Sequence, residues 1–146
     1  MSEILGASLF AMLFAQFLKL FTSLLQNRKL NLMRFVESGG MPSSHTAFVV
    51  CLSCSIGIVD GWQSSTFAIA VTFALIVMYD ATGVRRAAGL QARVLNQIID
   101  ELEKGHMIQD KRLKELLGHT PKEVLAGAVL GLLVAFVFNT PVPLVP

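Results

Sequence analysis

Charged residues are scarce in this sequence. Only 15% of its 146 residues are Asp, Glu, Lys or Arg, against 53% hydrophobic residues, and the mean hydropathy is +0.62. So little polar sequence cannot cover the core of an ordinary soluble protein, which excludes that class. The formal net charge is only +2 and there is no basic stripe, so we expect no nucleic-acid partner. We predict one integral-membrane domain, residues 1–146, with the lipid bilayer as its surroundings.

Cysteine is also scarce. Cys51 and Cys54 are the only two, and they lie within one apolar segment at a spacing that seldom reaches disulfide geometry in a helix. We expect both to be buried, reduced thiols. The N-terminus lacks the basic residues that begin a cleavable signal peptide, and its apolar run is long enough to be retained as an anchor.

Four apolar segments are candidates for membrane-crossing helices: residues 4–25, 42–60, 62–84 and 121–139. A helix needs about 20 residues, at ~1.5 Å per residue, to cross the hydrocarbon layer. We therefore predict an all-α fold, an integral-membrane helical bundle with four transmembrane helices. In the alternative, the last three segments form a soluble core, but too little polar sequence remains to cover them.

The one long hydrophilic region, residues 85–120, begins with an amphipathic pattern. Apolar residues recur there at helical spacing. These residues are Ala87, Leu90, Val94, Leu95, Ile98, Ile99 and Leu102. We expect a cytoplasmic amphipathic helix that lies on the membrane surface or against the bundle and ends at Gly105. A short helix over residues 111–117 should follow.

Basic residues are unevenly distributed along the chain. Ten of the 12 Lys and Arg lie in the first and third connectors, residues 26–41 and 85–120. The positive-inside rule places these connectors in the cytoplasm, or the stroma of a plastid, and both termini outside. A bacterial inner membrane and a plastid membrane both fit. Gly127 and Gly131 favour close helix packing, and a homodimer would complete so small a bundle.

The start of the second apolar segment, residues 39–47, is the first candidate site. Two glycines permit unusual backbone conformations there, and Pro42, Ser43 and Ser44 suit the start of a helix. The unpaired N–H groups and positive dipole end of such a start favour an anion. His45 adds a titratable group to this phosphate-binding geometry.

A second ionisable helix start contains His119 and Glu123. Their spacing of four places them on one helix face, where the carboxylate would orient the imidazole. The sequence from Thr120 to Glu123 also fits a capping box, with Pro121 at the first helical position. The spacing alone favours capping over a catalytic role for Glu123, and we expect one carboxylate geometry to dominate.

Further candidates are ionisable residues in or beside apolar segments. An ionisable group within a span costs a few kcal/mol, which makes Asp80 and Lys19 functional candidates, although Lys19 could also snorkel to the interface. Arg85 and Arg86 either mark topology or clamp a phosphate with their guanidinium groups. Arg34, in the first connector, is another candidate phosphate ligand.

These motifs resemble a known superfamily. The string Pro42-Ser43-Ser44-His45 resembles the Pro-Ser-Gly-His motif of the type-2 phosphatidic acid phosphatase and vanadium haloperoxidase superfamily. The string from His119 to Gly127 resembles its third motif, a histidine followed four residues later by an acid and then an Ala-Gly pair. The fuller strings over residues 39–45 and 79–86 are similar to a small divergent branch of that superfamily, over nearly the whole chain.

The resemblance implies site roles without metal or other cofactor. His119 would attack phosphorus to give a phosphohistidine, Glu123 would orient it, and His45 would protonate the leaving oxygen. Ser43 and Ser44 would bind the phosphate.

The chain departs from the superfamily at several positions. Ser44 replaces a glycine and Glu123 replaces an aspartate. The first motif, a lysine followed by Arg-Pro, is absent, and the arginine before the third-motif histidine falls on Leu113. Lys19, Arg28, Lys29 or Arg34 would have to replace the first motif, and Arg85 with Arg86 would supply the missing arginine charge.

Three functions remain from the sequence. The first is a membrane lipid phosphatase, a metal-independent hydrolase of a lipid phosphate monoester or diphosphate. The second is a non-hydrolytic anionic-lipid binding or transport protein that retains the phosphate pocket. The third is a metal site built from His45, Asp80, His119 and Glu123.

Overall fold

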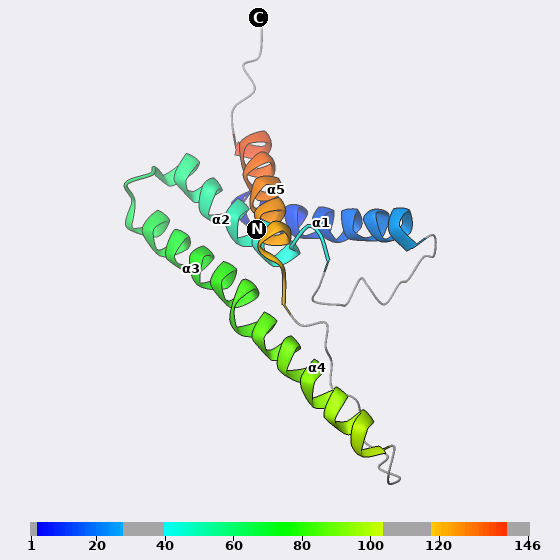
Figure 1. Ribbon diagram of the computed structural model, residues 1–146. Helices are drawn as coiled ribbons and strands as arrows, with labels where there is room; N and C mark the ends of the chain where they lie inside the picture. Colours follow the sequence, from blue (N-terminus) through cyan, green and yellow to red (C-terminus); the bar gives the residue numbers. More distant parts are fainter. Residues whose placement is uncertain (1–2, 28–39, 104–117, 140–146) are drawn as a thin grey trace, which may run out of the picture.

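The computed structural model describes residues 3–27, 40–103 and 118–139 (Figure 1). Helices occupy nearly all of these residues, and no strand occurs among them, so the all-α prediction is confirmed. In chain order the helices are α1 (Glu3–Asn27), α2 (Ser44–Asp60), α3 (Ser65–Thr82), α4 (Val84–Glu103) and α5 (Pro121–Asn139).

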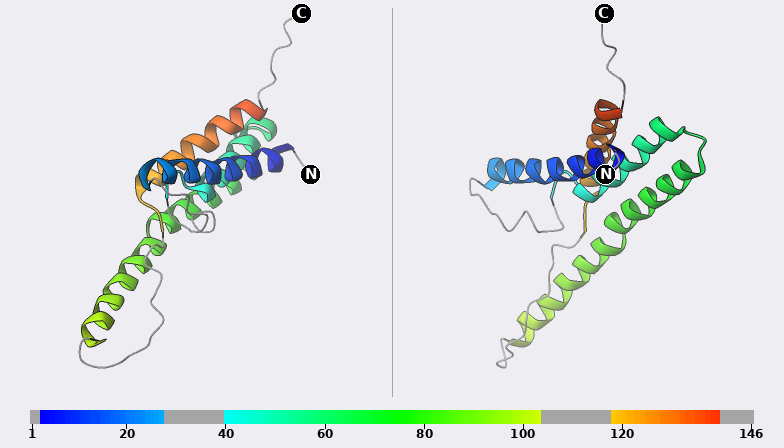
Figure 2. Two further views of the ribbon diagram at one scale, coloured as in Figure 1. Left: turned by 90° about the vertical axis from the view of Figure 1, so that its right-hand side faces the viewer. Right: turned by 180° about the vertical axis from the view of Figure 1, so that it is seen from behind.

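The helix α2 lies at the centre of the bundle. It packs against α1, α3 and α5, and α1 also contacts α5 (Figures 1 and 2). The main core cluster is built of small side chains, which let the helices approach closely. Its buried members are Ala7, Ala11, Ala15, Ala47, Cys51, Cys54, Val134 and Ala135. Both cysteines are buried and free, as predicted.

The closest approach is between α2 and α5. Both Gly127 and Gly131 are buried there, and a Cβ added at Gly127 would collide with the carbonyl oxygen of Ser43. A Cβ at Gly131 would lie 2.5 Å from the carbonyl oxygen of Ala47. The prediction that these glycines permit close helix packing is therefore confirmed.

Capping residues set the helix boundaries. The Ser43 side chain accepts the Thr46 N–H, so α2 begins at Ser44 rather than at residue 42. Ser64 caps α3 in the same way, which leaves Trp62 in the turn before it. The last helix begins at Pro121 and ends at Asn139, as the apolar pattern predicted.

The prediction of four transmembrane helices is supported in part. Three segments among the described residues have the length and apolar composition to cross a membrane: Glu3–Thr22, Ser65–Asp100 and Pro121–Asn139. The helix α2 is apolar but only 17 residues long. It is short because the Ser43 cap and the Asp60-Gly61 turn fix its two ends.

The amphipathic helix predicted in the hydrophilic region is α4, and one of its two expected placements, against the bundle, is not observed. Only Gly83 separates α4 from α3, and together they form one long rod (Figure 1). Helical hydrogen bonds flank the junction, from Gly83 N–H to Tyr79 O and from Ala87 N–H to Gly83 O, while Gly83 itself has a non-helical backbone with φ −100° and ψ −87°. Among the helices described, α4 contacts α3 alone, so it does not lie against the bundle. Gly105 and the short helix predicted over residues 111–117 lie outside the described residues.

Candidate functional site

The starts of α2 and α5 are joined by a backbone hydrogen bond. Ser43 N–H donates to the carbonyl oxygen of Glu123 at 3.0 Å. The Ser43 hydroxyl oxygen, fully buried, accepts from Thr46 N–H at 3.4 Å and from Thr46 Oγ1 at 3.0 Å. The two histidine motifs, far apart in sequence, therefore meet at one end of the bundle. Gly40 has a φ of +94°, as the glycine prediction required, while Gly39 lies outside the described residues.

Glu123 engages both the histidine and the backbone. Its Oε2 atom lies 3.1 Å from Nδ1 of His119 and accepts the Thr120 N–H at 3.0 Å. The Thr120 hydroxyl in turn accepts the Glu123 N–H at 3.4 Å, which completes the capping box. The expectation that one geometry would dominate is wrong, because a single carboxylate oxygen has lone pairs for both donors.

His119 is buried, with 4% of its surface exposed. Burial lowers the pKa of His119 below its ordinary value, while its hydrogen bond to Glu123 acts in the opposite direction. The charges of Lys19 and His45 also act on the ring and lower its pKa further. The lowered pKa favours the neutral form of the imidazole.

Lys19 reaches the site from α1. Its side chain is 4% exposed, and Nζ donates to the Ser44 hydroxyl at 3.4 Å. Thr22, one turn later, donates to the carbonyl oxygen of Met41 at 3.2 Å and fixes α1 beside the motif. Lys19 is thus buried in the bundle rather than snorkelling to an exposed position. His45, next to Ser44, is exposed.

The end of α3 supplies an ion pair. Arg85 Nε donates to Asp80 Oδ2 at 2.6 Å, with about half of the arginine side chain exposed. The charge of Arg85 also reaches His45. Asp80 therefore has a local partner, which accounts for a carboxylate near the end of an apolar helix. Arg86 is exposed beside this pair.

Two backbone groups that the sequence analysis left unassigned position the histidine. His119 N–H donates to the carbonyl oxygen of Ala81 at 2.9 Å. Gly118 has a φ of +86°, and any Cβ there would collide with the backbone of Arg85 and Arg86. A glycine immediately before the motif histidine was the signal for this close approach. The pair of contacts ties His119 to the α3–α4 junction.

Arg34 lies outside the described residues. Within the described ranges, no group of three or more His, Cys, Asp or Glu side chains gathers closely enough to hold a metal ion, so the metal-site hypothesis gains no support.

Comparisons with known proteins identify the family of this chain. The model of the Divergent PAP2 family matches residues 1–134. The chain is 41% identical to the uncharacterized membrane protein YuiD of Bacillus subtilis (strain 168), with 90% of each chain covered. No solved structure matches it. With the match extending over α1 to α4, most of α5 and both histidine motifs, this membrane protein belongs to the Divergent PAP2 family.

Proposed function

We propose that this protein is a membrane lipid phosphatase that hydrolyses a lipid phosphate monoester or diphosphate through a phosphohistidine. The observation that carries the proposal is the buried His119, hydrogen-bonded through Nδ1 to Glu123, beside a buried lysine and the start of α2. A neutral, oriented imidazole is what nucleophilic attack requires. Family membership supports a relationship to phosphatases, and the activity itself is our proposal.

In the first step, Nε2 of His119 attacks phosphorus. The N–P bond forms as the bond from phosphorus to the lipid oxygen breaks, and His45 gives its proton to that oxygen. The positive charge that develops on the His119 ring is balanced by Glu123. In the second step, water attacks phosphorus, His45 takes a proton from it, and phosphate leaves with His119 restored.

The phosphate oxygens would be held by three kinds of donor. Lys19 supplies a buried positive charge in place of the missing first motif, at hydrogen-bond distance from Ser44. The N–H groups at the start of α2 and the Ser44 hydroxyl add dipoles. Arg85, oriented by Asp80, and Arg86 would contribute guanidinium groups from the α3–α4 junction. Ser43 would act mainly by capping α2.

The substrate is proposed to enter from the inner leaflet. In this arrangement α2 is a fourth, short membrane-crossing helix, and the connectors that flank the site face the cytoplasm or stroma. The tail of the lipid then stays in the bilayer while its phosphate reaches the basic end of the bundle.

The test is phosphate release by the purified protein in detergent or liposomes from a panel of lipid phosphates. We expect turnover that vanadate inhibits and chelators do not, and no turnover by the His119→Ala variant. Equal turnover by that variant would exclude this mechanism. A non-hydrolytic lipid-binding protein would instead bind the same lipids saturably and release no phosphate, and the departures at Ser44 and in the first motif favour that outcome as the second candidate.

A further inference from the structure

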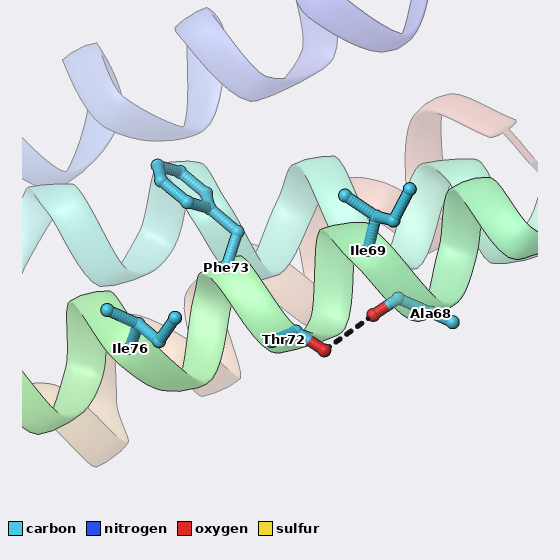
Figure 3. Close-up of a pocket in the computed structure, with 5 residues that line it drawn as sticks. All are labelled: Ala68, Ile69, Thr72, Phe73 and Ile76. Carbon is cyan, nitrogen blue, oxygen red and sulfur yellow. Dashed lines mark hydrogen bonds between the residues drawn. The ribbon is translucent and has the colours of Figure 1, made fainter.

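The rod formed by α3 and α4 is a regular helix until it reaches its junction. On α3 an exposed groove runs along one helix, lined by Ala68, Ile69, Thr72, Phe73 and Ile76 (Figure 3). The Thr72 hydroxyl there donates to the carbonyl oxygen of Ala68, four residues earlier. The hydroxyl of this groove is thus used within α3, and the polar groups of the rod that reach the candidate site lie at the junction.

At the junction, Gly83 interrupts the helical hydrogen bonds. Its φ of −100° and ψ of −87° lie outside the helical range. In an uninterrupted helix, the Arg85 N–H would donate to the carbonyl oxygen of Ala81. Among the described residues, the N–H groups of Val84, Arg85 and Arg86 donate to no backbone carbonyl oxygen. The carbonyl oxygen of Ala81 is therefore released from its own helix.

The released carbonyl oxygen serves the motif histidine instead. It accepts the His119 N–H at 2.9 Å, and Ala81 is itself buried. Gly118 packs so closely on the backbone of Arg85 and Arg86 that no Cβ fits between them. A carbonyl oxygen can accept two hydrogen bonds, so space rather than lone pairs decides which donors reach it. If the first turn of α4 closed into a regular helix, the backbone on which Gly118 packs would move, and the approach of His119 N–H to Ala81 would be lost.

The same interruption sets the direction of Arg85. Residues five positions apart in a regular helix project about 140° apart, so their side chains do not normally meet. Across Gly83, however, Arg85 Nε donates to Oδ2 of Asp80, five residues earlier, at 2.6 Å. The charge of Arg85 acts on His45. One interruption therefore provides both a backbone acceptor for His119 and the orientation of a guanidinium group whose charge reaches the other histidine.

This conformation requires a glycine at position 83. In the backbone as it stands, a Cβ on residue 83 would lie 2.9 Å from the carbonyl oxygen of Tyr79, which also accepts the Gly83 N–H at 2.8 Å. That separation is closer than van der Waals contact, and the backbone must shift to relieve it. A regular helix accommodates alanine without such a contact and favours it over glycine. Replacement of Gly83 by alanine should therefore close the interruption.

We propose that Gly83 is a positioning residue of the candidate active site. Its interruption of the rod presents the Ala81 carbonyl oxygen to His119 and directs Arg85 to Asp80. Gly83 acts through these residues and has no contact with the reacting atoms. The proposal rests on the proposed function, because it takes His119 as the nucleophile.

Amide hydrogen exchange of the full chain in detergent, followed by NMR, tests the proposal. In the wild-type protein the His119 amide should be protected and the Arg85 amide should exchange rapidly. In Gly83→Ala we expect the reverse: the Arg85 amide becomes protected, and the His119 amide exchanges about 100-fold faster. Gly6→Ala is the matched control, because the added Cβ has no neighbour within 4 Å, and it should leave both exchange rates unchanged.

Phosphate release provides the second measurement. A small displacement of the nucleophile should lower kcat in Gly83→Ala roughly 100-fold. The unfolding temperature should be unchanged or higher, because alanine favours the helix, and this separates positioning from damage to the fold. If the wild-type protein releases no phosphate from any lipid, the proposed function fails, whereas the exchange of the two amides still decides whether Gly83 places His119.

Three results would overturn the proposal. A protected Arg85 amide or an unprotected His119 amide in the wild-type protein would mean that the interruption does not serve the histidine. Unchanged protection of His119, or an unchanged kcat, in Gly83→Ala would mean that His119 does not depend on Gly83. Loss of protection at His119 without a gain at Arg85 would mean that closure of the helix is not the cause.

Discussion

At the scale of single residues, the carboxylate of Glu123 links folding to the proposed chemistry. One oxygen caps α5 through Thr120 N–H and orients the His119 ring. Glutamine retains an oxygen that accepts both hydrogen bonds but loses the negative charge. The Glu123→Gln and Glu123→Ala variants therefore separate the capping role from the electrostatic role.

For Glu123→Gln we expect phosphate release to fall about 100-fold or more, because the charge that balances the attacking imidazole is lost. Thermal stability in detergent should stay close to wild type. Since Glu123 raises the pKa of His119, its neutralisation lowers that pKa further. Activity depends on neutral His119 and is lost as pH falls through its pKa, so the acid limb of the pH–rate profile should move to lower pH.

The Glu123→Ala variant should lose activity and also about 1 kcal/mol of stability, because its cap is gone. Thermal unfolding of both variants in detergent measures the difference. If both variants kept the phosphate release of the wild type and only Glu123→Ala were destabilised, the residue would serve α5 alone.

Lys19 is the second informative residue. A buried lysine is costly to retain, and a methionine of similar shape removes the charge without leaving a cavity. We expect Lys19→Met to reduce kcat/KM at least 100-fold while the unfolding temperature in detergent is unchanged or higher. Lys19→Arg, which keeps the charge, is the control. A Lys19→Met protein with normal kinetics would show that this lysine does not replace the missing first motif.

At the scale of helices, the contact between α2 and α5 sets the separation of the two histidine motifs. In Gly127→Ala the added methyl group collides with the Ser43 carbonyl, so the start of α2 must move away from Glu123. We expect the free energy of unfolding to fall by about 1–3 kcal/mol and most of the phosphate release to be lost. The control is Gly6→Ala on α1, where the added Cβ has no neighbour within 4 Å. Equal effects of both substitutions would contradict this account of the contact.

Helices whose ends are encoded locally could be predicted from the sequence. Pro121 and the capping box set the start of α5, and its apolar run reaches Asn139, so the predicted bounds of α5 agree with the observed ones at both ends. The sequence also implied that the two histidine motifs meet, because the basic connectors place both motifs at the same end of the bundle. The ion pair of Asp80 with Arg85 and the contact of Gly118 with the α3–α4 junction were not predictable, since each depends on tertiary placement.

The α3–α4 rod shows where local signals fail. Gly83 and the charged residues after it suggest a helix end, and the apolar pattern changes there from uniform to amphipathic. Yet α4 begins one residue after Gly83 and runs on from α3 as one rod, although Gly83 itself has a non-helical backbone (Figure 1). Glycine permits a break and does not enforce one, so the sequence alone could not distinguish a bent α4 from a straight one.

At the scale of the whole molecule, the orientation in the membrane decides which lipid pool the site can reach. The site lies where α2 and α5 begin, and the turn between α2 and α3 is the far end of α2. The concentration of basic residues in the connectors beside the site predicts that this end faces the cytoplasm or stroma. The turn that carries Trp62 and Gln63, both exposed, must then face the opposite side.

Single-cysteine labelling in bacterial cells tests this orientation. A membrane-impermeant maleimide should label Gln63→Cys in intact cells, because that side chain is exposed in the outer turn. Gln97→Cys, exposed on α4, should react only after the inner membrane is permeabilised. The wild-type chain should not react in either case, since Cys51 and Cys54 are buried. The reverse labelling pattern would place His119 and Lys19 at the outer leaflet, and the substrate would then have to be a lipid phosphate of that leaflet.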